Sequence, residues 1–323
     1  MAKKPTIAIT MGDPAGVGPE IVLKALDNSR VRRICSPVVI GDRGVLGLIA
    51  RKLRLKPLND AEVKGVSSID VKRLRPGRPT MESSRAMISY IDEAVSMAQD
   101  GEAAAIVTGP ISKEAAKLAG FGFPGHTEFI AHLTGTKDFC MMLGGVGLKV
   151  VLVTIHAALK DVPRLVTSAS VLKTIKITDA AFKKYGFKRP RIAVAGLNPH
   201  AGEAGMFGDE EKKAIAPAIK RARALGIDAV GPLPPDTVFY RAVRKKEFDC
   251  VVCMYHDQGL GPLKLLHFED GVNATLGLPI IRTSVDHGTA YDIAWKGVAN
   301  PDSLIAAIEM AVEMARAGKK QRG

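Results

Sequence analysis

Short apolar runs alternate with longer amphipathic stretches along almost the whole chain. Strands are predicted at 7–10, 38–40, 103–107, 140–143, 150–155, 192–197 and 250–254. Stretches with helical periodicity lie between them, at 21–26, 83–98, 114–118, 128–133, 171–185, 210–225 and 301–317. This alternation is typical of βαβ units, and it predicts an α/β fold with mostly parallel sheets covered by helices on both faces.

Three of the predicted strands lead to a histidine: 150–155 to His156, 192–197 to His200, and 250–254 to His256. A single histidine after a strand is usually a structural hydrogen-bonding residue. Three at the carboxyl ends of strands, where open α/β sheets bind their ligands, favour a shared role. Imidazole is a common ligand for divalent metals, and three histidines with open positions are typical of a catalytic metal site. Acidic residues that follow them would orient the rings: Asp161, Glu203 and Asp257.

Two turns are candidates for binding an anion. The turn Gly12–Gly18 joins a strand to a helix, but its spacing matches neither the dinucleotide fingerprint nor the P-loop. A weak phosphate site and a tight structural turn therefore both remain open. Thr127 is predicted to cap the helix 128–133, which places His126 and Thr127 at a helix N-terminus that favours an anion. A plain capping turn gives the same pattern.

Two loops are predicted to present charged side chains. The proline-rich segment 231–237 is predicted to be a rigid loop that presents Asp236. The glycine-punctuated segment after the strand 250–254 is predicted to be a loop that carries both His256 and Lys264. Lysine is rarely buried, so a solvated surface residue is the plainer interpretation of Lys264 taken alone.

The composition is that of a globular protein without a membrane segment. Of the 323 residues, 46% are hydrophobic and 24% are charged, and no apolar stretch approaches the ~20 residues that a membrane span needs. The first apolar run is too short for a secretory signal and meets Gly12 at once, so we expect a cytoplasmic protein. Cys250 and Cys253 lie inside an apolar run without a second pair at zinc spacing, which indicates buried core thiols.

The formal net charge of +13 is compatible with nucleic acid, an anionic surface or an anionic small substrate as partner. The basic residues are spread over predicted helix faces and ends, and aromatic residues make up only 5% of the chain and do not interleave with them. Binding of single strands needs aromatic stacking platforms beside the charges. We therefore expect no nucleic-acid partner. A non-catalytic nucleic-acid-binding α/β protein remains the alternative from another class.

Six motifs resemble the 4-hydroxythreonine-4-phosphate dehydrogenase family of pyridoxal phosphate biosynthesis. They cover essentially the whole chain: Thr10–Glu20, Pro124–Glu128, Leu197–Glu203, Pro234–Thr237, Met254–Gly259 and Leu278–Ala290. The resemblance implies a two-lobed α/β/α fold like that of isocitrate and isopropylmalate dehydrogenases. The first lobe would contain 1–130 together with 275–323 and the nucleotide loop. The second, 131–274, would contain the metal site and the dimer contacts, with the active site in the cleft between the lobes.

The resemblance also implies roles for individual residues. The divalent-metal ligands would be His156, His200 and, from the opposite subunit of a homodimer with shared sites, His256. The substrate would be bound by His126, Thr127, Lys264, Asn273 and Arg282. A loop without a Rossmann fingerprint would bind NAD or NADP through Asp286, His287, Gly288 and Thr289. Lys264 or Asp236 would assist proton transfer. Ala157 and Ala158 are smaller than the family leads us to expect beside His156.

The implied reaction is a metal-dependent oxidation and decarboxylation of 4-phosphooxy-L-threonine to 3-amino-2-oxopropyl phosphate, in pyridoxine 5'-phosphate biosynthesis. A zinc, magnesium or cobalt ion would act as a Lewis acid on the substrate alcohol, and the nicotinamide would take the hydride. The family also has members that oxidise other phosphorylated four-carbon acids. The alternative is therefore a D-threonate or D-erythronate 4-phosphate dehydrogenase, because the shared motifs do not separate these substrates.

Overall fold

The structure is a computed structural model that describes residues 4–320, with side chains up to residue 318. The chain forms two compact units. Unit 1 contains the residues up to Lys137 and then Leu278–Arg316, and unit 2 contains Asp138–Gly277 and the residues from Ala317. Unit 2 is thus an almost continuous stretch of chain placed between two parts of unit 1.

The strands of unit 1 are all parallel to their neighbours, in the order β3-β2-β1-β4-β11. Their bounds are β1 Thr6–Thr10, β2 Ser36–Gly41, β3 Val63–Gly65, β4 Ala105–Thr108 and β11 Arg282–Val285. Because parallel strands share one carboxyl edge, the connections that begin at residues 11, 42, 66, 109 and 286 all leave from that edge. The short edge strand β3 lies in a segment for which the sequence predicts irregular structure.

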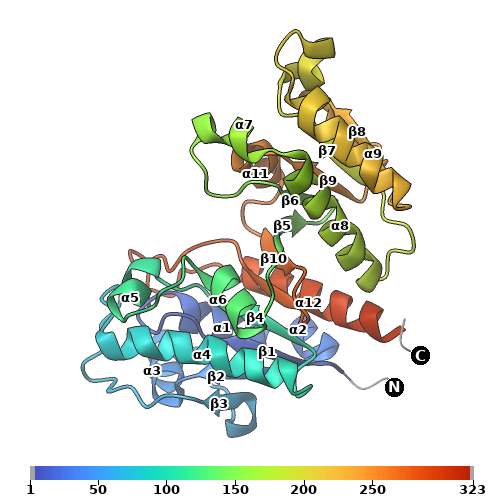
Figure 1. Cartoon of the computed structure of the whole chain (residues 1–323). Helices are drawn as coiled ribbons and strands as arrows, with labels where there is room; N and C mark the ends of the chain where they lie inside the picture. Colours follow the sequence, from blue (N-terminus) through green and yellow to red (C-terminus); the bar gives the residue numbers. More distant parts are fainter. Residues whose placement is uncertain (1–3, 321–323) are drawn as a thin grey trace. The chain divides into compact units, whose positions relative to one another are not determined.

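The helices of unit 1 are α1 Gly18–Asp27, α2 Ser29–Ile34, α3 Arg43–Leu53, α4 Met81–Gln99, α5 Lys113–Leu118, α6 His126–Leu133 and α12 Asp302–Lys320, with a 3-10 turn at Asp60–Glu62. The long helix α4 packs on β1, β2 and β4 and contacts α5 and α6 (Figure 1). It begins with a capping box in which Thr80 and Ser83 exchange side-chain-to-backbone hydrogen bonds. All residues of β4 and β11 are buried, as expected for parallel strands covered on both faces.

Unit 2 has a mixed sheet in the order β10-β5-β6-β9-β7-β8. Its strands are β5 Cys140–Gly145, β6 Leu148–Leu152, β7 Ile192–Ala195, β8 Ala229–Leu233, β9 Cys250–Cys253 and β10 Val272–Leu276. The pairs β10–β5 and β5–β6 are antiparallel, and the remaining pairs are parallel. The alternating polar residues of β10, which include Asn273, concealed this strand from the sequence prediction.

The helices of unit 2 are α7 Val162–Leu165, α8 Ser168–Lys184, α9 Ala216–Ala224, α10 Pro235–Val243 and α11 His256–Leu266, with 3-10 turns at Leu159–Asp161 and Pro199–Gly205 and a π-helical segment at Glu211–Ile215. Helix α8 packs on β5, β6 and α9, whereas α10 and α11 pack on β6 and β9. The alternate residues Val150 and Leu152 of β6 and Val251 and Cys253 of β9 enter one buried cluster with Leu263 of α11. Strand periodicity and helix packing therefore agree.

The prediction of a loop after the strand 250–254 was wrong, because His256–Leu266 forms helix α11. The sequence does not indicate this helix, because the segment contains two glycines and Pro262, which have low helix propensity. Gly259 has a packing reason: a Cβ there would lie 3.1 Å from Cys253 Sγ and 3.2 Å from Leu152 Cδ2. A residue without a side chain lets α11 approach the sheet closely.

Two further boundaries differ from the sequence prediction. Asp236 lies in the first turn of α10 and not in a rigid loop, since Pro235 already occupies a helical position where its missing N–H is tolerated. Strand β6 ends at Leu152 and not at residue 155. Beyond the end of β6, the N–H groups of Val153 and Thr154 still donate to the carbonyls of Cys253, in β9, and of Met254, which follows it.

The role of Gly259 predicts opposite effects for two alanine substitutions in α11. Gly259→Ala should destabilise the protein by about 1–3 kcal/mol, because the added methyl group overpacks the contact with β6 and β9. Gly261→Ala is the matched control: its Cβ would meet no described atom within 4 Å, so the gain in helix propensity should stabilise by about 0.5–1 kcal/mol. Urea unfolding followed by circular dichroism measures both. Equal effects would contradict close packing at Gly259.

Candidate functional site

In unit 1, the N-terminus of α6 brings together several of the predicted substrate-binding residues. The helix begins at His126, with the extended residue Gly125 as N-cap and no side-chain cap. The prediction that Thr127 caps the helix was therefore wrong, since Thr127 is already the second helical residue. His126 and Thr127 do lie at the helix N-terminus, and Thr127 is buried. The free backbone N–H groups and the helix dipole favour a negative charge at this end.

His126 is a neutral imidazole in this structure. The pKa of His126 is lowered to about 3, mainly by burial and also by the nearby Arg282 and Lys113, against the opposing effect of a hydrogen bond to the Gly109 backbone. Its Nε2 atom is buried and has no hydrogen-bond partner among the described residues. A neutral ring that donates through one nitrogen keeps a lone pair on the other. His126 can therefore accept a hydrogen bond from a ligand's hydroxyl or ammonium group.

Arg282 supplies a buried positive charge beside this helix end. It is 3% exposed, and its Nη2 donates to Thr108 Oγ1 at 2.9 Å, which ties the first residue of β11 to the last residue of β4. Burial lowers the pKa of Arg282 to about 10, and the carboxylate of Glu128 in α6 opposes this shift. Arg282 therefore remains a cation at neutral pH. A buried guanidinium next to a helix N-terminus is suited to a phosphate or carboxylate.

The predicted nucleotide-binding residues Asp286, His287, Gly288 and Thr289 begin the connection from β11 to α12. The N–H of Asp286 donates to Ser303 Oγ at 3.1 Å, and the carbonyl of Thr289 accepts from Val17 N at 3.0 Å. His287 and Gly288 are exposed between these two anchors, and a Cβ on Gly288 would meet no described atom within 4 Å. The segment is thus fixed at both ends and open in the middle, as a ligand-binding loop requires.

The turn Gly12–Gly18 proves to be structural. Its N–H groups are used inside the protein: Asp13 N donates to Pro110 O, Ala15 N to Asp13 Oδ1, and Gly16 N to Asp13 O. Gly12 has a φ of 73°, and a Cβ there would lie 2.5 Å from Pro110 O. Of the two interpretations left open by the sequence, the tight turn is the one that the geometry supports.

In unit 2, two of the three predicted metal ligands lie close together within one chain. The ring centres of His156 and His256 are 5.8 Å apart. His256 is the first residue of α11, and its Nδ1 lies 2.6 Å from Asp257 Oδ1. With Nδ1–H donated to this carboxylate, Nε2 carries the lone pair that a metal needs. Imidazoles that share one ion at ~2.0–2.1 Å have ring centres about 5 Å apart, so the pair fits two ligand positions.

His200 lies apart from this pair, in a segment with an unusual backbone. His200, Ala201, Gly202, Glu203 and Ala204 all have positive φ, between 40° and 84°. This left-handed conformation costs roughly 1–2 kcal/mol for each residue other than glycine. Among residues 4–320, no three His, Cys, Asp or Glu side chains are arranged to hold a metal ion. The predicted three-histidine set is therefore not assembled in the described chain.

Glu211, which the sequence did not single out, holds the His200 segment in place. Its buried carboxylate accepts from Leu197 N at 2.7 Å, Asn198 N at 2.8 Å and Asn198 Nδ2 at 2.9 Å. Gly196 and Gly202 crowd the same carboxylate: a Cβ on Gly202 would lie 2.8 Å from Glu211 Oε2. Glu211 begins a π-helical segment, a feature that often marks functional sites. The only sign of this contact in the sequence is the pair Gly196 and Gly202, for which no other role is predicted.

The remaining predicted residues lie elsewhere in unit 2. Lys264 is in the last turn of α11, half-buried, with Nζ 5.4 Å from the ring centre of Phe268. Eight helical positions separate it from His256, which corresponds to about 12 Å along the axis. Asn273 is in β10 opposite Leu143, and Asp236 is exposed on α10. Within unit 2, therefore, Lys264 and His256 do not share one loop as predicted.

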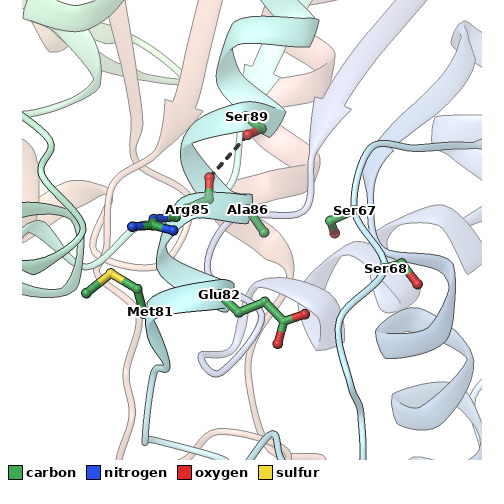
Figure 2. Close-up of a pocket in the computed structure, with 7 residues that line it drawn as sticks. All are labelled: Ser67, Ser68, Met81, Glu82, Arg85, Ala86 and Ser89. Atoms are coloured by element: carbon green, nitrogen blue, oxygen red, sulfur yellow. Dashed lines mark hydrogen bonds between the residues drawn. The ribbon is translucent and has the colours of Figure 1, made fainter.

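A pocket of about 490 Å³ in unit 1 contains none of the predicted site residues. It lies between the N-terminal part of α4 and the segment after β3 (Figure 2), and it is lined by Ser67, Ser68, Met81, Glu82, Arg85, Ala86 and Ser89. Beneath it, Ser67 Oγ donates to Asp42 Oδ2 at 2.8 Å and lies 2.7 Å from Tyr90 Oη. Ser67, Asp42 and Tyr90 thus satisfy one another's hydrogen bonds.

Cys250 and Cys253 are buried free thiols, as the sequence predicted, and so are Cys35 and Cys140. Burial raises the pKa of Cys250 and of Cys253 far above the ordinary value, so neither is a reactive thiolate at neutral pH. None of the helices in the described part of the chain is both long and apolar enough to cross a membrane.

Comparison with known proteins finds relatives that match most of the chain. The model of the family PdxA, pyridoxal phosphate biosynthetic protein, matches residues 33–311. A "4-hydroxythreonine-4-phosphate dehydrogenase" of Geobacter metallireducens is 55% identical over 97% of this chain and 96% of its own. A "D-threonate 4-phosphate dehydrogenase" of Pectobacterium atrosepticum is 45% identical over 96% and 99%. The crystal structure of the 4-hydroxythreonine-4-phosphate dehydrogenase of Klebsiella pneumoniae has a TM-score of 0.86 at 42% identity, covering 97% and 100%.

The lowered pKa of His126 predicts how stability depends on pH. His126 stays neutral in the folded state down to about pH 3, whereas in the unfolded chain it takes up a proton near pH 6.5. The unfolded state therefore binds more protons between these values, and stability falls as the pH falls below 6.5. Replacing His126 with Asn should remove about 2 kcal/mol of the loss between pH 7 and pH 5. Urea unfolding at both pH values tests this, and the exposed His132→Asn is the control. An unchanged pH dependence in His126→Asn would be the contrary result.

Proposed function

The chain belongs to the PdxA family of pyridoxal phosphate biosynthetic proteins, and we propose that it is an NAD- or NADP-dependent 4-hydroxythreonine-4-phosphate dehydrogenase. It oxidises the secondary alcohol of 4-phosphooxy-L-threonine to a ketone, and the resulting β-keto acid loses CO2 to give 3-amino-2-oxopropyl phosphate. The observation that carries this proposal is the 55% identity to a relative of that name over almost the full length of both chains. The buried cation and neutral imidazole at the α6 N-terminus support it.

In this proposal, the unit 1 residues hold the substrate. The substrate carries a phosphate, a carboxylate and an ammonium group. Arg282 and the N-terminal N–H groups of α6 pair with an anionic group, because both are positively polarised and shielded from water. The Nε2 lone pair of His126 accepts from the ammonium or hydroxyl group. Such contacts fix the orientation of the reacting carbon.

The metal site involves His156, His256 and His200. The 5.8 Å ring separation and the Asp257 contact support the first two as ligands of a divalent ion such as zinc, magnesium or cobalt. His200 is not assembled with them within the described chain, and the family resemblance implies that the opposite subunit supplies His256. When bound, the ion supplies Lewis-acid stabilisation of negative charge, and the nicotinamide ring accepts a hydride.

Proton transfer is assigned to Lys264 or Asp236, and Asn273 completes the substrate contacts. Lys264 is half-buried, and its Nζ lies 5.4 Å from the ring centre of Phe268. Asp286, His287, Gly288 and Thr289 bind the nicotinamide dinucleotide. The two fixed ends of this segment and the open space at Gly288 support that role.

A homodimer with shared sites is part of the proposal. Unit 2 exposes large apolar side chains at the β5–β6 turn, at the end of α11 and just after it: Val146 is 88% exposed, Leu265 86% and Phe268 78%. Apolar surface of this kind is typical of a protein–protein interface. A site shared between subunits, with His256 from the partner, is compatible with the absence of an assembled three-histidine set among residues 4–320.

A D-threonate or D-erythronate 4-phosphate dehydrogenase is the alternative. The specific observation in its favour is the relative of Pectobacterium atrosepticum, which is 45% identical to this chain. The two substrate classes differ at the carbon that carries either an ammonium or a hydroxyl group. The lone pair of His126 accepts a hydrogen bond from either, so the described geometry is compatible with both.

Initial rates with a panel of substrates test the proposed activity. The purified protein should reduce NAD or NADP with 4-phosphooxy-L-threonine at a kcat/KM at least roughly tenfold above that with D-threonate or D-erythronate 4-phosphate, a difference of about 1.4 kcal/mol. Nicotinamide absorbance follows the reaction, and trapping of released CO2 confirms the second step. A preference for a four-carbon acid without nitrogen would favour the alternative. No turnover of any member would contradict both.

Metal content tests the ligand assignment independently of activity. His156→Ala and His256→Ala should each bind zinc or cobalt at least roughly tenfold more weakly than the unchanged protein, since each removes a ligand. Equilibrium dialysis with elemental analysis measures the affinity. His132→Ala removes an exposed histidine that packs on Phe123 and should bind metal normally. Equal metal affinity in all three variants would reject the site.

A further inference from the structure

The connection 286–301, between β11 and α12, is long, irregular and strained. It contains the four proposed nucleotide-binding residues. Ala290 and Trp295 have φ values of 43° and 60°, a region that residues with a side chain rarely adopt, and Gly297 has a φ of 81°. Such a conformation persists only where the surrounding structure enforces it. The groups that enforce this conformation therefore determine the shape that the connection presents to a ligand.

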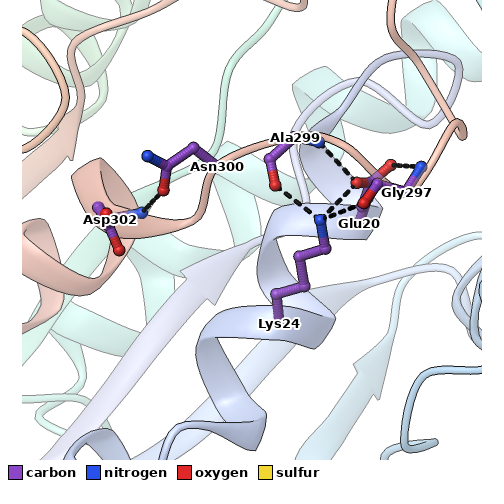
Figure 3. A network of polar contacts seen from close by, with 6 residues as sticks. All are labelled: Glu20, Lys24, Gly297, Ala299, Asn300 and Asp302. Carbon is purple, nitrogen blue, oxygen red and sulfur yellow. Dashed lines mark hydrogen bonds and ion pairs between the residues drawn. The ribbon is translucent and has the colours of Figure 1, made fainter.

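Two residues of α1 enforce it at one point. Glu20 accepts from Ala299 N through Oε1 at 2.9 Å and from Gly297 N through Oε2 at 3.1 Å. Lys24, one helical turn later, donates from Nζ to the carbonyls of Gly297 at 2.8 Å and Ala299 at 2.7 Å. Figure 3 shows both side chains reaching the same short segment of the connection. Together they bind the N–H and the carbonyl of both residues.

The two side chains also depend on each other. Lys24 Nζ lies 2.8 Å from Glu20 Oε1, and the carboxylate side chain is fully buried. A buried charge without its partner is strongly unfavourable, so loss of either side chain disrupts the whole arrangement. Lys183 and Asp179 in α8 of unit 2 form an ion pair with the same spacing and the same 2.8 Å distance.

We propose that Glu20 and Lys24 are positioning residues that hold the connection 286–301 in the conformation that binds the nicotinamide dinucleotide. The inference rests on the proposed function, in which this connection binds NAD or NADP. A segment that is already ordered loses less conformational entropy when a ligand binds, so the arrangement raises nucleotide affinity. Neither residue is among the proposed metal, substrate or proton-transfer residues. Loss of either side chain should therefore raise KM for the nucleotide and leave kcat largely unchanged.

Trp295 allows binding to be measured without turnover. It is the only tryptophan of the chain, it is 5% exposed, and it lies within the connection, two positions before Gly297. Titration with NADH, and separately with NADPH, should quench its fluorescence by energy transfer to the reduced nicotinamide. Lys24→Met should bind the preferred nucleotide at least roughly tenfold more weakly, because the connection must then be ordered on binding. Metal affinity should not change.

The controls separate positioning from a general loss of stability. Lys183→Met breaks the matched ion pair and should bind the nucleotide normally. Lys24→Arg keeps a cation that can reach both carbonyls and should recover most of the affinity. Where Lys24→Met does not fold, as judged by circular dichroism, Glu20→Gln replaces it in the titration with the same expected loss.

Normal nucleotide affinity in the folded variant would overturn the inference and leave the proposed function intact. No binding of either nucleotide by the unchanged protein would overturn the nucleotide assignment, and the inference with it.

Discussion

Buried carboxylates that accept hydrogen bonds from backbone N–H groups fix the irregular connections of this protein. Asp42 accepts from Val45 N and Ile69 N, Glu20 from Gly297 N and Ala299 N, and Glu211 from Leu197 N and Asn198 N. A carboxylate is an effective acceptor for unpaired amides because it has two oxygens and a charge. Each lies at or near the carboxyl end of a strand, or holds a connection that leaves from such an end. The segment around His200 and the connection 286–301 depend on this recurring contact.

The regular elements could be predicted from the sequence because their apolar periodicity is strong. The long helices α4, α8 and α12 and the buried strands β1, β4, β7 and β9 lie close to their predicted ranges. The failures have local causes. Helix α11 was missed because Gly259 and Pro262 have low helix propensity, although tertiary packing on β6 favours the glycine. The start of α6 was misplaced because the Gly125 backbone takes the N-cap position.

The candidate site could be predicted only as a set of residue types. The motifs predict that His126 and Arg282 contact a substrate, but only the fold shows that burial makes His126 a neutral acceptor and leaves Arg282 a cation. The supporting residues were beyond the sequence argument, because Glu211 acts on Leu197 and Asn198 from a separate element. The left-handed backbone at His200 could not be predicted either, since four of the five residues concerned have side chains that disfavour it.

The insertion of unit 2 between two parts of unit 1 bears on how the chain folds. Strand β11 pairs with β4 in a register that joins Arg282 to Ile106, across 176 positions of sequence (282 − 106). During synthesis, β4 therefore emerges long before its neighbour and presents an unpaired edge, which is prone to wrong pairing. Unit 2 is nearly continuous and can form its own contacts first, while unit 1 waits for its last strand. Such non-local pairing slows folding, so the later part of the chain determines when Arg282 and the N-terminus of α6 come together.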